Sequence, residues 1–367
     1  HAPRVLRLAE IPHFPAVLRG DEKLPNQILN HKHKILDGHC PTLTAYDLQA
    51  YQTAGSRSDH DATTDREGRE KIENGMFLMI REGTSAKDVE RLLPLVDNRN
   101  SRRFCFVSDD LHAEDIQQRG HLDFVVKKAI RLGLDPIPAI QLATLNPAEY
   151  FGLKDRGAIA PGYRADLAVL DDLERFEVNL VFKDGHLVVD NGVLINYPME
   201  NHPVRTKKAK PLNMAPIRPE SFRIRHPGGK ARVIELVPGQ LITRTRYQHV
   251  KSSHGWVVSD TESDILKLCV VERHQASGRI GMGLVKGFAL TGGALASSVA
   301  HDSHNVIAVG VSDEEIFRAV EAVRRMGGGL AVALGHETLA EIPLPIAGLM
   351  SVEPLEILAA RLKSIKT

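Results

Sequence analysis

The chain has 367 residues, enough for two or three domains, and its 43% hydrophobic and 25% charged content is that of an ordinary globular protein. Lys and Arg number 47 against 46 Asp and Glu, which leaves no net field to attract nucleic acid or an anionic membrane. No apolar run approaches the roughly 18 residues of a membrane helix, and the first residues lack a signal-peptide pattern. Three widely spaced cysteines without a CxxC pair predict reduced thiols in a cytoplasmic protein.

Five short apolar runs in the first 110 residues each end on a residue type that binds metals. These residues are Glu10, His39, His60, Glu82 and Asp109. The stretches between the runs have a helical pattern, so the order is strand, polar residue, helix, repeated. We predict parallel strands of a (β/α)₈ barrel, in which the active site lies at the carboxyl ends of the strands. A metal site is therefore expected at these ends.

Helical patterns and turn signals divide the chain further. We expect helices at about 21–33, 42–54, 121–132, 136–150 and 313–326, and a helix opened by a Thr64–Glu67 capping box and stopped at Gly75. Asp184-Gly185 predicts a β-hairpin. The fold class is α/β, and the predicted domains are a partial barrel at 1–155, a small β-sandwich segment at 156–196, a Pro-rich linker at 197–219 and a second α/β domain at 220–367.

Two histidines and one aspartate are the leading candidates for metal chemistry. His39 and His60 end successive predicted strands, and two imidazoles in this relation indicate metal ligands more strongly than either strand-end histidine alone. Asp109 offers a carboxylate that can hold and deliver a proton beside metal-activated water. Asp109 or Asp110 could instead cap the following helix. Glu10 fits a carboxylate between two metals and an ordinary strand-end acid equally well.

Two further polar or glycine-rich segments are ambiguous or weak. His301, Asp302 and His304 in AHDSHN could bind a metal or reach over a barrel mouth, but a polar turn between two strands explains them as well. The segment GRIGMGLVKG has the glycines of a phosphate loop without its strand-to-helix context or a GKS or GKT sequence, so it is a weak nucleotide motif.

Long segments along nearly the whole chain strongly resemble the bacterial adenine deaminases, a family of metal-dependent amidohydrolases. The resemblance rests on RLAEI, ILDGHCP, RSDHDATT, MIREGTSAKD, FVSDDLHAEDIQQRGHLDFVVKKAIRLGLDP, QLATLNPAEYFGLKDRGAIAPGYRADLAVLDDLE, VERHQASGRIGMGLVKGF and SSVAHDSHN. It implies hydrolysis of adenine to hypoxanthine and ammonia in purine salvage, at a binuclear site with manganese or iron. The ligand types also suit zinc. It also implies that residues 1–155 are the later part of an amidohydrolase barrel, that 220–367 is the family's C-terminal domain, and that the protein is a homo-oligomer.

The resemblance also implies roles for individual residues. Glu10 matches the family's bridging carboxylate, His39 and His60 match the histidines of the next two strands, and Asp109 matches the strand-eight aspartate. In that reading hydroxide attacks C6 of the purine, Asp109 takes its proton, and Asp109 with His60 passes protons to the ring nitrogen and the departing ammonia. Further candidates for purine contacts are Arg81, Glu82, Asp110 and His112.

One departure from the family pattern limits what we expect of this chain alone. The family carries a His-x-His pair on its first barrel strand, and no barrel strand precedes Glu10; HKHKI at 31–35 lies in a helical stretch and is rejected as a substitute. We therefore expect a chain cut at both ends, lacking about the first half of the barrel and inactive alone. The alternatives are a related amidohydrolase acting on another cyclic amidine or amide, and a non-catalytic module on a degenerate barrel.

Overall fold

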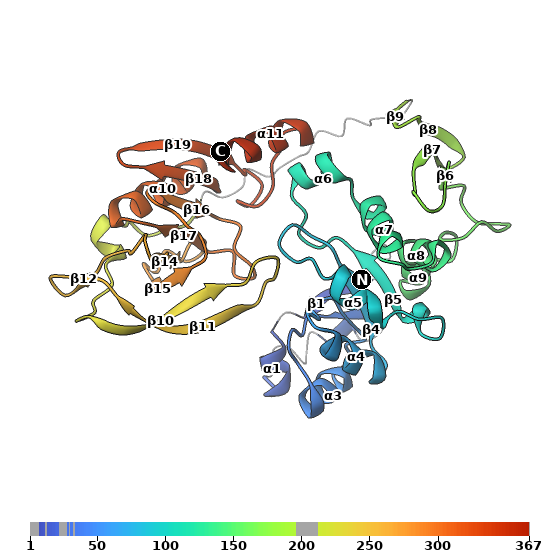
Figure 1. Ribbon diagram of the computed structural model, residues 1–367, viewed down its shortest axis with the longest axis horizontal. Helices are drawn as coiled ribbons and strands as arrows, with labels where there is room; N and C mark the ends of the chain where they lie inside the picture. The colour runs from blue at the N-terminus through green and yellow to red at the C-terminus, as the bar shows by residue number, and fades with distance from the viewer. Residues whose placement is uncertain are drawn as a thin grey trace. The chain divides into compact units, whose positions relative to one another are not determined.

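The computed structural model describes residues 7–11, 13–21, 28, 30–31, 34–195 and 212–366, with backbone alone at 7–10 and 366. The chain divides into two compact units, residues 1–201 and 202–367 (Figure 1). The finer division that we predict, at 155, 196 and 219, remains a prediction. Within the described residues, no helix is long and apolar enough to span a membrane.

The first half of the first unit is built from parallel strands separated by helices. β1 (Arg7–Ile11) pairs in parallel with β2 (Ile35–Gly38). A second parallel sheet has the order β3 (Ser58–Asp59), β4 (Phe77–Arg81), β5 (Phe104–Val107). The connecting helices are α1 (Phe14–Leu18), α3 (Ala45–Thr53), α4 (Asp65–Glu73), α5 (Val89–Leu92), η1 (Leu93–Leu95) and η2 (Ser101–Arg103), and α6 (Ala113–Arg119), α7 (Leu122–Arg131), α8 (Pro136–Ala143) and α9 (Leu145–Tyr150) follow β5. The predicted α/β fold of barrel type is confirmed.

Capping and turn residues set the ends of these helices. The Thr64 side chain accepts a hydrogen bond from the Glu67 amide at the start of α4, and Gly75 takes a positive φ of 82° after its end. The expected single helix at 136–150 is wrong, because it is broken at Thr144 into α8 and α9. Pro147 explains the break, since its nitrogen cannot donate to the Ala143 carbonyl and its ring would clash there. The helix expected at 21–33 lies largely outside the described residues.

β4 is buried along both of its faces, as expected for a barrel strand between an interior and a helical layer. Leu78 and Ile80 pack with residues of β5 and of the helices α5, α7 and α8. Phe77 and Met79, which alternate with them, pack with Cys105, Tyr150 and Phe151. The alternation gives β4 a helix-facing side and an inner side, and it directs the polar residues after the strand to the carboxyl end of the sheet.

A four-stranded antiparallel sheet ends the first unit. Its strands, in sheet order, are β6 (Leu167–Leu170), β7 (Val178–Lys183), β8 (His186–Asp190) and β9 (Val193–Leu194). Asp184 and Gly185 connect β7 and β8 with φ values of 48° and 81°. Two consecutive positive φ values are those of a type I′ turn, so the predicted hairpin is confirmed.

The second unit is an eight-stranded mixed sheet. The strand order is β11 (Thr243–Val250), β10 (Gly229–Leu236), β15 (Ile280–Lys286), β14 (Leu266–Val271), β17 (Val306–Gly310), β16 (Ala294–Ser297), β18 (Gly329–Leu334), β19 (Glu337–Pro343). The remaining elements are η3 (Pro219–Phe222), the ribbon β12 (Ser252–Ser253) with β13 (Trp256–Val257), α10 (Asp313–Met326) and α11 (Leu355–Lys366). The helix predicted at 313–326 is confirmed, and GRIGMGLVKG lies mainly in strand β15, not in a phosphate loop.

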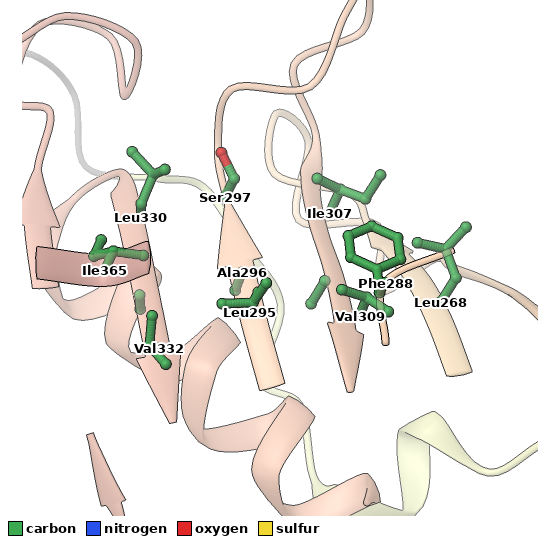
Figure 2. Close-up of a pocket in the computed structure, with 12 residues that line it drawn as sticks. Leu268, Phe288, Leu295, Ala296, Ser297, Ile307, Val309, Leu330, Val332 and Ile365 are labelled. Carbon is green, nitrogen blue, oxygen red and sulfur yellow. The ribbon is translucent and has the colours of Figure 1, made fainter. Parts of the chain in front are cut away.

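The two sides of this sheet are covered differently. Residues of α10, among them Ile316 and Val320, pack on alternate strand residues such as Ala296 and Ala308. The residues between these, including Leu295 and Val309, line an apolar hollow of about 250 Å³ (Figure 2). Ile365 of α11 lies at this hollow as well.

Candidate metal centre

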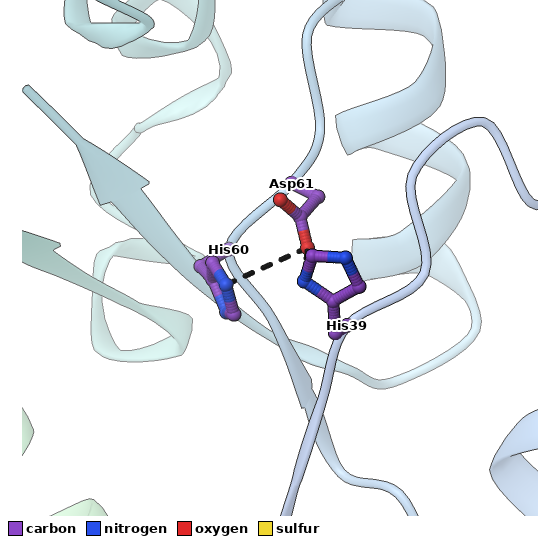
Figure 3. A group of neighbouring side chains, drawn as sticks. All are labelled: His39, His60 and Asp61. Carbon is purple, nitrogen blue, oxygen red and sulfur yellow. Dashed lines mark ion pairs between the residues drawn. The ribbon is translucent and has the colours of Figure 1, made fainter. Parts of the chain in front are cut away.

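Two loops at the ends of β2 and β3 bring three side chains of metal-binding type together. His39 follows β2, and His60 and Asp61 follow β3. The Asp61 Oδ2 atom lies 2.8 Å from His39 Nδ1 and 3.5 Å from His60 Nε2 (Figure 3). In the part of the chain that the structure describes, these three form the only group of three or more His, Cys, Asp or Glu side chains whose ligand atoms all lie within 4.8 Å of one another.

The geometry of this group fits a divalent cation. Metal bonds of about 2.0–2.2 Å place neighbouring ligand atoms about 3 to 3.5 Å apart, close to the two distances above. Asp61 Oδ2 is buried and accepts no hydrogen bond from the described residues, although two imidazole nitrogens lie near it. Imidazole and carboxylate ligands suit manganese, iron and zinc alike, so the residues present fit the metal that the resemblance implies.

Arg81, at the end of β4, connects this group to Asp109. One guanidinium nitrogen, Nη1, donates to Asp61 Oδ1 at 2.6 Å and to Asp109 Oδ2 at 3.1 Å, and Nε donates to Asp88 at 2.8 Å. Burial disfavours the charged guanidinium, but Asp61 and Asp88 outweigh it and hold the pKa of Arg81 above its ordinary value. The Arg81 side chain is only 2% exposed, so its guanidinium is a buried cation that joins Asp61 to Asp109.

Asp109 stands at the end of β5 in a left-handed backbone conformation, with φ of 56°. Aspartate tolerates this region better than most residues, and such conformations concentrate at functional sites. The loops after β4 and β5 approach closely here, since a Cβ atom on Gly83 would lie 2.8 Å from the carbonyl oxygens of Ser108 and Asp110. The Asp109 side chain is 28% exposed, so its carboxylate is both held by Arg81 and open to a small molecule.

Other predicted residues of the first unit lie outside this group. Glu82 is buried, and its Oε1 accepts from Lys128 Nζ at 2.8 Å. Asp110 and His112 are exposed beside Asp109 and belong to no ligand group among the described residues. Glu10 lies in β1, and its side chain is outside the described part of the chain. Its neighbour Ile11 pairs with Gly38, directly before His39, so the backbone of Glu10 is near the site.

The three polar candidates of the second unit lie in a turn. His301, Asp302 and His304 stand between the antiparallel strands β16 and β17, as the turn interpretation predicts. The His301 and His304 ring centroids are 4.8 Å apart, but no third ligand atom joins them within the described residues.

Asp61, central to this arrangement, escaped prediction although it directly follows His60 in RSDHDATT. Tyr51 was also missed: its hydroxyl accepts from the His39 amide and donates to the Ile11 carbonyl, each at 3.1 Å, and so joins the loops after β1 and β2. Burial raises the pKa of Tyr51 well above its ordinary value, which keeps the hydroxyl as a donor. A helical tyrosine carries no sequence signal for such a contact.

A buried set of charges below the loops was missed too. It consists of Asp59, Glu67 and Lys71, with the Lys71 ammonium 2.8 Å from Asp59 and 2.7 Å from Glu67. Burial alone would raise the pKa of Asp59, but the charge of Lys71 outweighs it, so that the pKa of this carboxyl lies well below its usual range. The neighbouring carboxylates likewise hold the pKa of Lys71 above its ordinary value, so Asp59 and Lys71 form a buried ion pair at neutral pH.

Comparison with known proteins gives two family matches and many relatives. Residues 27–188 match the amidohydrolase family, and residues 240–367 match the adenine deaminase C-terminal domain. The chain is 48% identical over 357 residues to an adenine deaminase of Desulfatibacillum aliphaticivorans, covering 96% of this chain and 62% of the relative. For an adenine deaminase of Dehalococcoides mccartyi the identity is 44% over 363 residues, covering 99% and 63%. Adenine deaminase 2 of Carboxydothermus hydrogenoformans is 45% identical over 352 residues, covering 95% and 61%. The chain thus spans less than two thirds of the length of each.

Proposed function

Because this chain belongs to the adenine deaminases of the amidohydrolase family, we propose that it carries part of a metal centre that hydrolyses adenine to hypoxanthine and ammonia. The observation that supports the proposal most is the convergence of His39, His60 and Asp61 at neighbouring strand ends, with Asp109 joined to them through Arg81. Residues from the ends of several different strands are the usual source of catalytic groups in such barrels.

In this proposal the two imidazoles of His39 and His60 bind metal. Asp61 is the proposed third ligand, since its Oδ2 atom lies 2.8 Å from His39 Nδ1 and 3.5 Å from His60 Nε2. Glu10 is proposed as the bridging carboxylate of a binuclear site, supported by the pairing of its neighbour Ile11 with Gly38 beside His39. Manganese or iron is the proposed metal, and zinc fits the same ligands.

When bound, the metal makes water acidic enough to be a nucleophile at neutral pH. Asp109 is the proposed proton carrier: its partly exposed carboxylate takes one proton from the attacking water and passes it to the ring nitrogen, while the second proton of that water goes to the departing amino group, which leaves as ammonia. Arg81 holds one oxygen of that carboxylate at 3.1 Å, which fixes its direction. His60 is the proposed second proton carrier, through the ring nitrogen that does not bind the metal.

Purine contacts are proposed at the rim of the cluster. Asp110 and His112 are exposed beside Asp109 and can meet a small planar base. Arg81 already binds the carboxylates of Asp61 and Asp88, and Glu82 already binds Lys128. We therefore propose that Arg81 and Glu82 support the strand ends instead of contacting the purine.

The reaction is tested on a chimera that joins this chain to the segments of the Desulfatibacillum aliphaticivorans relative outside the aligned region. We expect the manganese-loaded chimera to release ammonia from adenine and not from guanine, cytosine or dihydroorotate. Asp109→Asn should lower kcat by about 10²- to 10⁴-fold, the usual contribution of a general acid–base group. Glu90→Gln, which removes an exposed acid of α5, is the matched control and should leave the rate unchanged. No release from adenine, or faster release from another substrate of the panel, would overturn the proposal.

The proposed location is the cytoplasm. Cys40, Cys105 and Cys269 are buried and form no disulfide, which supports the proposal of a reducing, cytoplasmic setting. Adenine is the proposed small-molecule partner, and a homo-oligomer is proposed from the family alone.

A further inference from the structure

We propose that Asp59, Glu67 and Lys71, here called the charge triad, position the two loops that carry His39 and His60–Asp61. The inference rests on the proposed metal centre and adds positioning residues to it. None of the three side chains belongs to the ligand group itself. Their effect is exerted through the backbone of the loops.

The triad is a compact set of charges with almost no access to water. Glu67 and Lys71 lie one turn apart on α4, while Asp59 is the last residue of β3. Asp59 and Lys71 are 0% exposed and Glu67 is 5% exposed. The Lys71 ammonium binds a carboxylate oxygen of each acid.

The loop that carries His39 is held by all three members. Asp59 Oδ1 accepts from the Cys40 amide at 2.9 Å, and Lys71 Nζ donates to the Cys40 carbonyl at 2.9 Å. Glu67 Oε1 accepts from the Thr42 amide at 2.7 Å. The backbone directly after His39 is therefore held at the N–H and C=O groups of Cys40 and at the N–H group of Thr42.

The loop that carries His60 and Asp61 is held by the same two acids. Asp59 Oδ2 accepts from the amides of Asp61 and Ala62 at 2.9 and 3.0 Å. Glu67 Oε2 accepts from the Thr63 amide at 3.1 Å. Each acid of the triad thus bonds both loops, one through each of its carboxylate oxygens, and so sets the separation between them.

Stability alone does not account for three buried charges at this place. Burying ions costs free energy, and replacing a buried ionic cluster by apolar residues often leaves a protein as stable or more so. The partners of the triad, by contrast, are backbone groups next to the ligand residues. Groups that orient metal ligands from outside typically change metal affinity by about 10- to 100-fold when removed.

A neutral isostere cannot make the same contacts. A carboxylate accepts through both oxygens, whereas an amide has one accepting oxygen and turns N–H donors toward its other partners. In Asp59→Asn the amide nitrogen would face the Cys40 amide or the amides of Asp61 and Ala62. In Glu67→Gln it would face Thr42 or Thr63. Each substitution should therefore break the hydrogen bonds to one of the two loops, so that the side chain no longer joins them.

The test measures metal binding by the chain itself. Mn²⁺ and Zn²⁺ affinities are obtained by competition with a chelating dye, and the visible spectrum of the Co²⁺-loaded chain reports ligand geometry. For Asp59→Asn and Glu67→Gln we expect about 10- to 100-fold weaker binding and an altered Co²⁺ spectrum. The matched control is Asn146→Ala, which removes a buried side chain that bonds the Ser101 and Phe104 carbonyls at the opposite end of β5. It should lower the thermal midpoint while the affinity and the spectrum stay unchanged.

A triple variant separates positioning from stability. Asp59→Asn with Glu67→Gln and Lys71→Met removes all three buried charges and leaves none of them unpaired, so the thermal midpoint should recover while metal affinity stays low. Recovery of metal affinity together with the thermal midpoint in this variant would overturn the positioning role. A loss of metal affinity in Asn146→Ala as large as that in Asp59→Asn would overturn it as well. The proposal also fails if both single variants bind metal like the unsubstituted chain. If the unsubstituted chain binds no metal, the proposed centre fails and the triad's role with it, whereas a lack of adenine hydrolysis by the chimera bears on the reaction alone.

Discussion

Two segments of this protein, 39–61 and 301–304, each hold two histidines with an aspartate directly after one of them. Among the described residues, only the first segment forms a ligand group. At the ends of β2 and β3, His39, His60 and Asp61 come from loops about 20 residues apart and meet around one carboxylate oxygen. In the turn after β16, His301, Asp302 and His304 are neighbours in sequence, yet no three ligand atoms come together there among the described residues.

The difference lies in what holds the backbone. At the strand ends, parallel pairing and buried charges fix the loops, so that side chains from separate strands point to one place. The turn in the second unit is held by Arg273, which donates to the backbone carbonyls of His304 and Ala347. His301, Asp302 and His304 therefore belong to a turn whose backbone Arg273 holds. Residue type alone does not make a metal site.

The largest effect is expected from removing the charge shared by the strand ends. Arg81→Met leaves Asp61, Asp88 and Asp109 without their common cation, and breaking a buried ion pair in this way costs about 3–5 kcal/mol. Hydrogen exchange of peptides from residues 34–150 measures the loss. Arg91→Met is the matched control: it also removes a partner of Asp88, but its side chain is 34% exposed, so about 1 kcal/mol or less is expected. Equal losses in the two variants would contradict the larger contribution expected of the buried Arg81 charge.

A smaller effect is expected on metal binding, and it shows which of the two segments binds the metal. His60→Ala removes a proposed ligand, and Zn²⁺ affinity of the chain should fall by more than about 100-fold, since one of three protein ligands is lost. His301→Ala takes an imidazole from the turn and should leave the affinity unchanged. Competition with a chelating dye measures both, and a fall with His301→Ala alone would place the metal in the second unit.

The smallest effect concerns a turn near the second segment. Three backbone amides, those of Ser277, His274 and Gln275, donate to Glu272 and lower its pKa to about 2. A carboxyl whose pKa is lowered on folding stabilises the fold above its unfolded pKa of about 4.3, and this contribution is lost as the pH falls toward 2. Glu272→Gln should therefore be slightly less stable at pH 7, and the difference should close between about pH 4 and pH 2. The fluorescence of Trp256, the single tryptophan, reports unfolding of this unit. A difference that persists at pH 2 would contradict the assignment.

Much of the fold followed from local signals. Thr64 and Gly75 mark the ends of α4, and the pair Asp184-Gly185 marks the hairpin of β7 and β8, because these residues satisfy helix ends or positive φ values at low cost. The break at Thr144 also had its signal in Pro147, which the helical periodicity of 136–150 outweighed in the prediction.

The site was only partly open to prediction. His39, His60 and Asp109 could be proposed as candidates because each ends an apolar run, and strand ends meet at one edge of a parallel sheet. Lys71 could not, because a lysine on a helix normally faces water, and only the pairing with Asp59 across the fold buries it. Asp61 carried a weak signal beside His60, but its convergence on His39 depends on how two distant loops pack.

Diffraction from a crystal of the chain soaked in Mn²⁺, collected to locate the anomalous scattering of manganese, tests the central claim most directly. We expect a peak within about 2.0–2.3 Å of the His39 and His60 imidazole nitrogens, with the Asp61 carboxylate beside it. A peak at His301 or His304 with none between His39 and His60, or no peak at either segment, would contradict it.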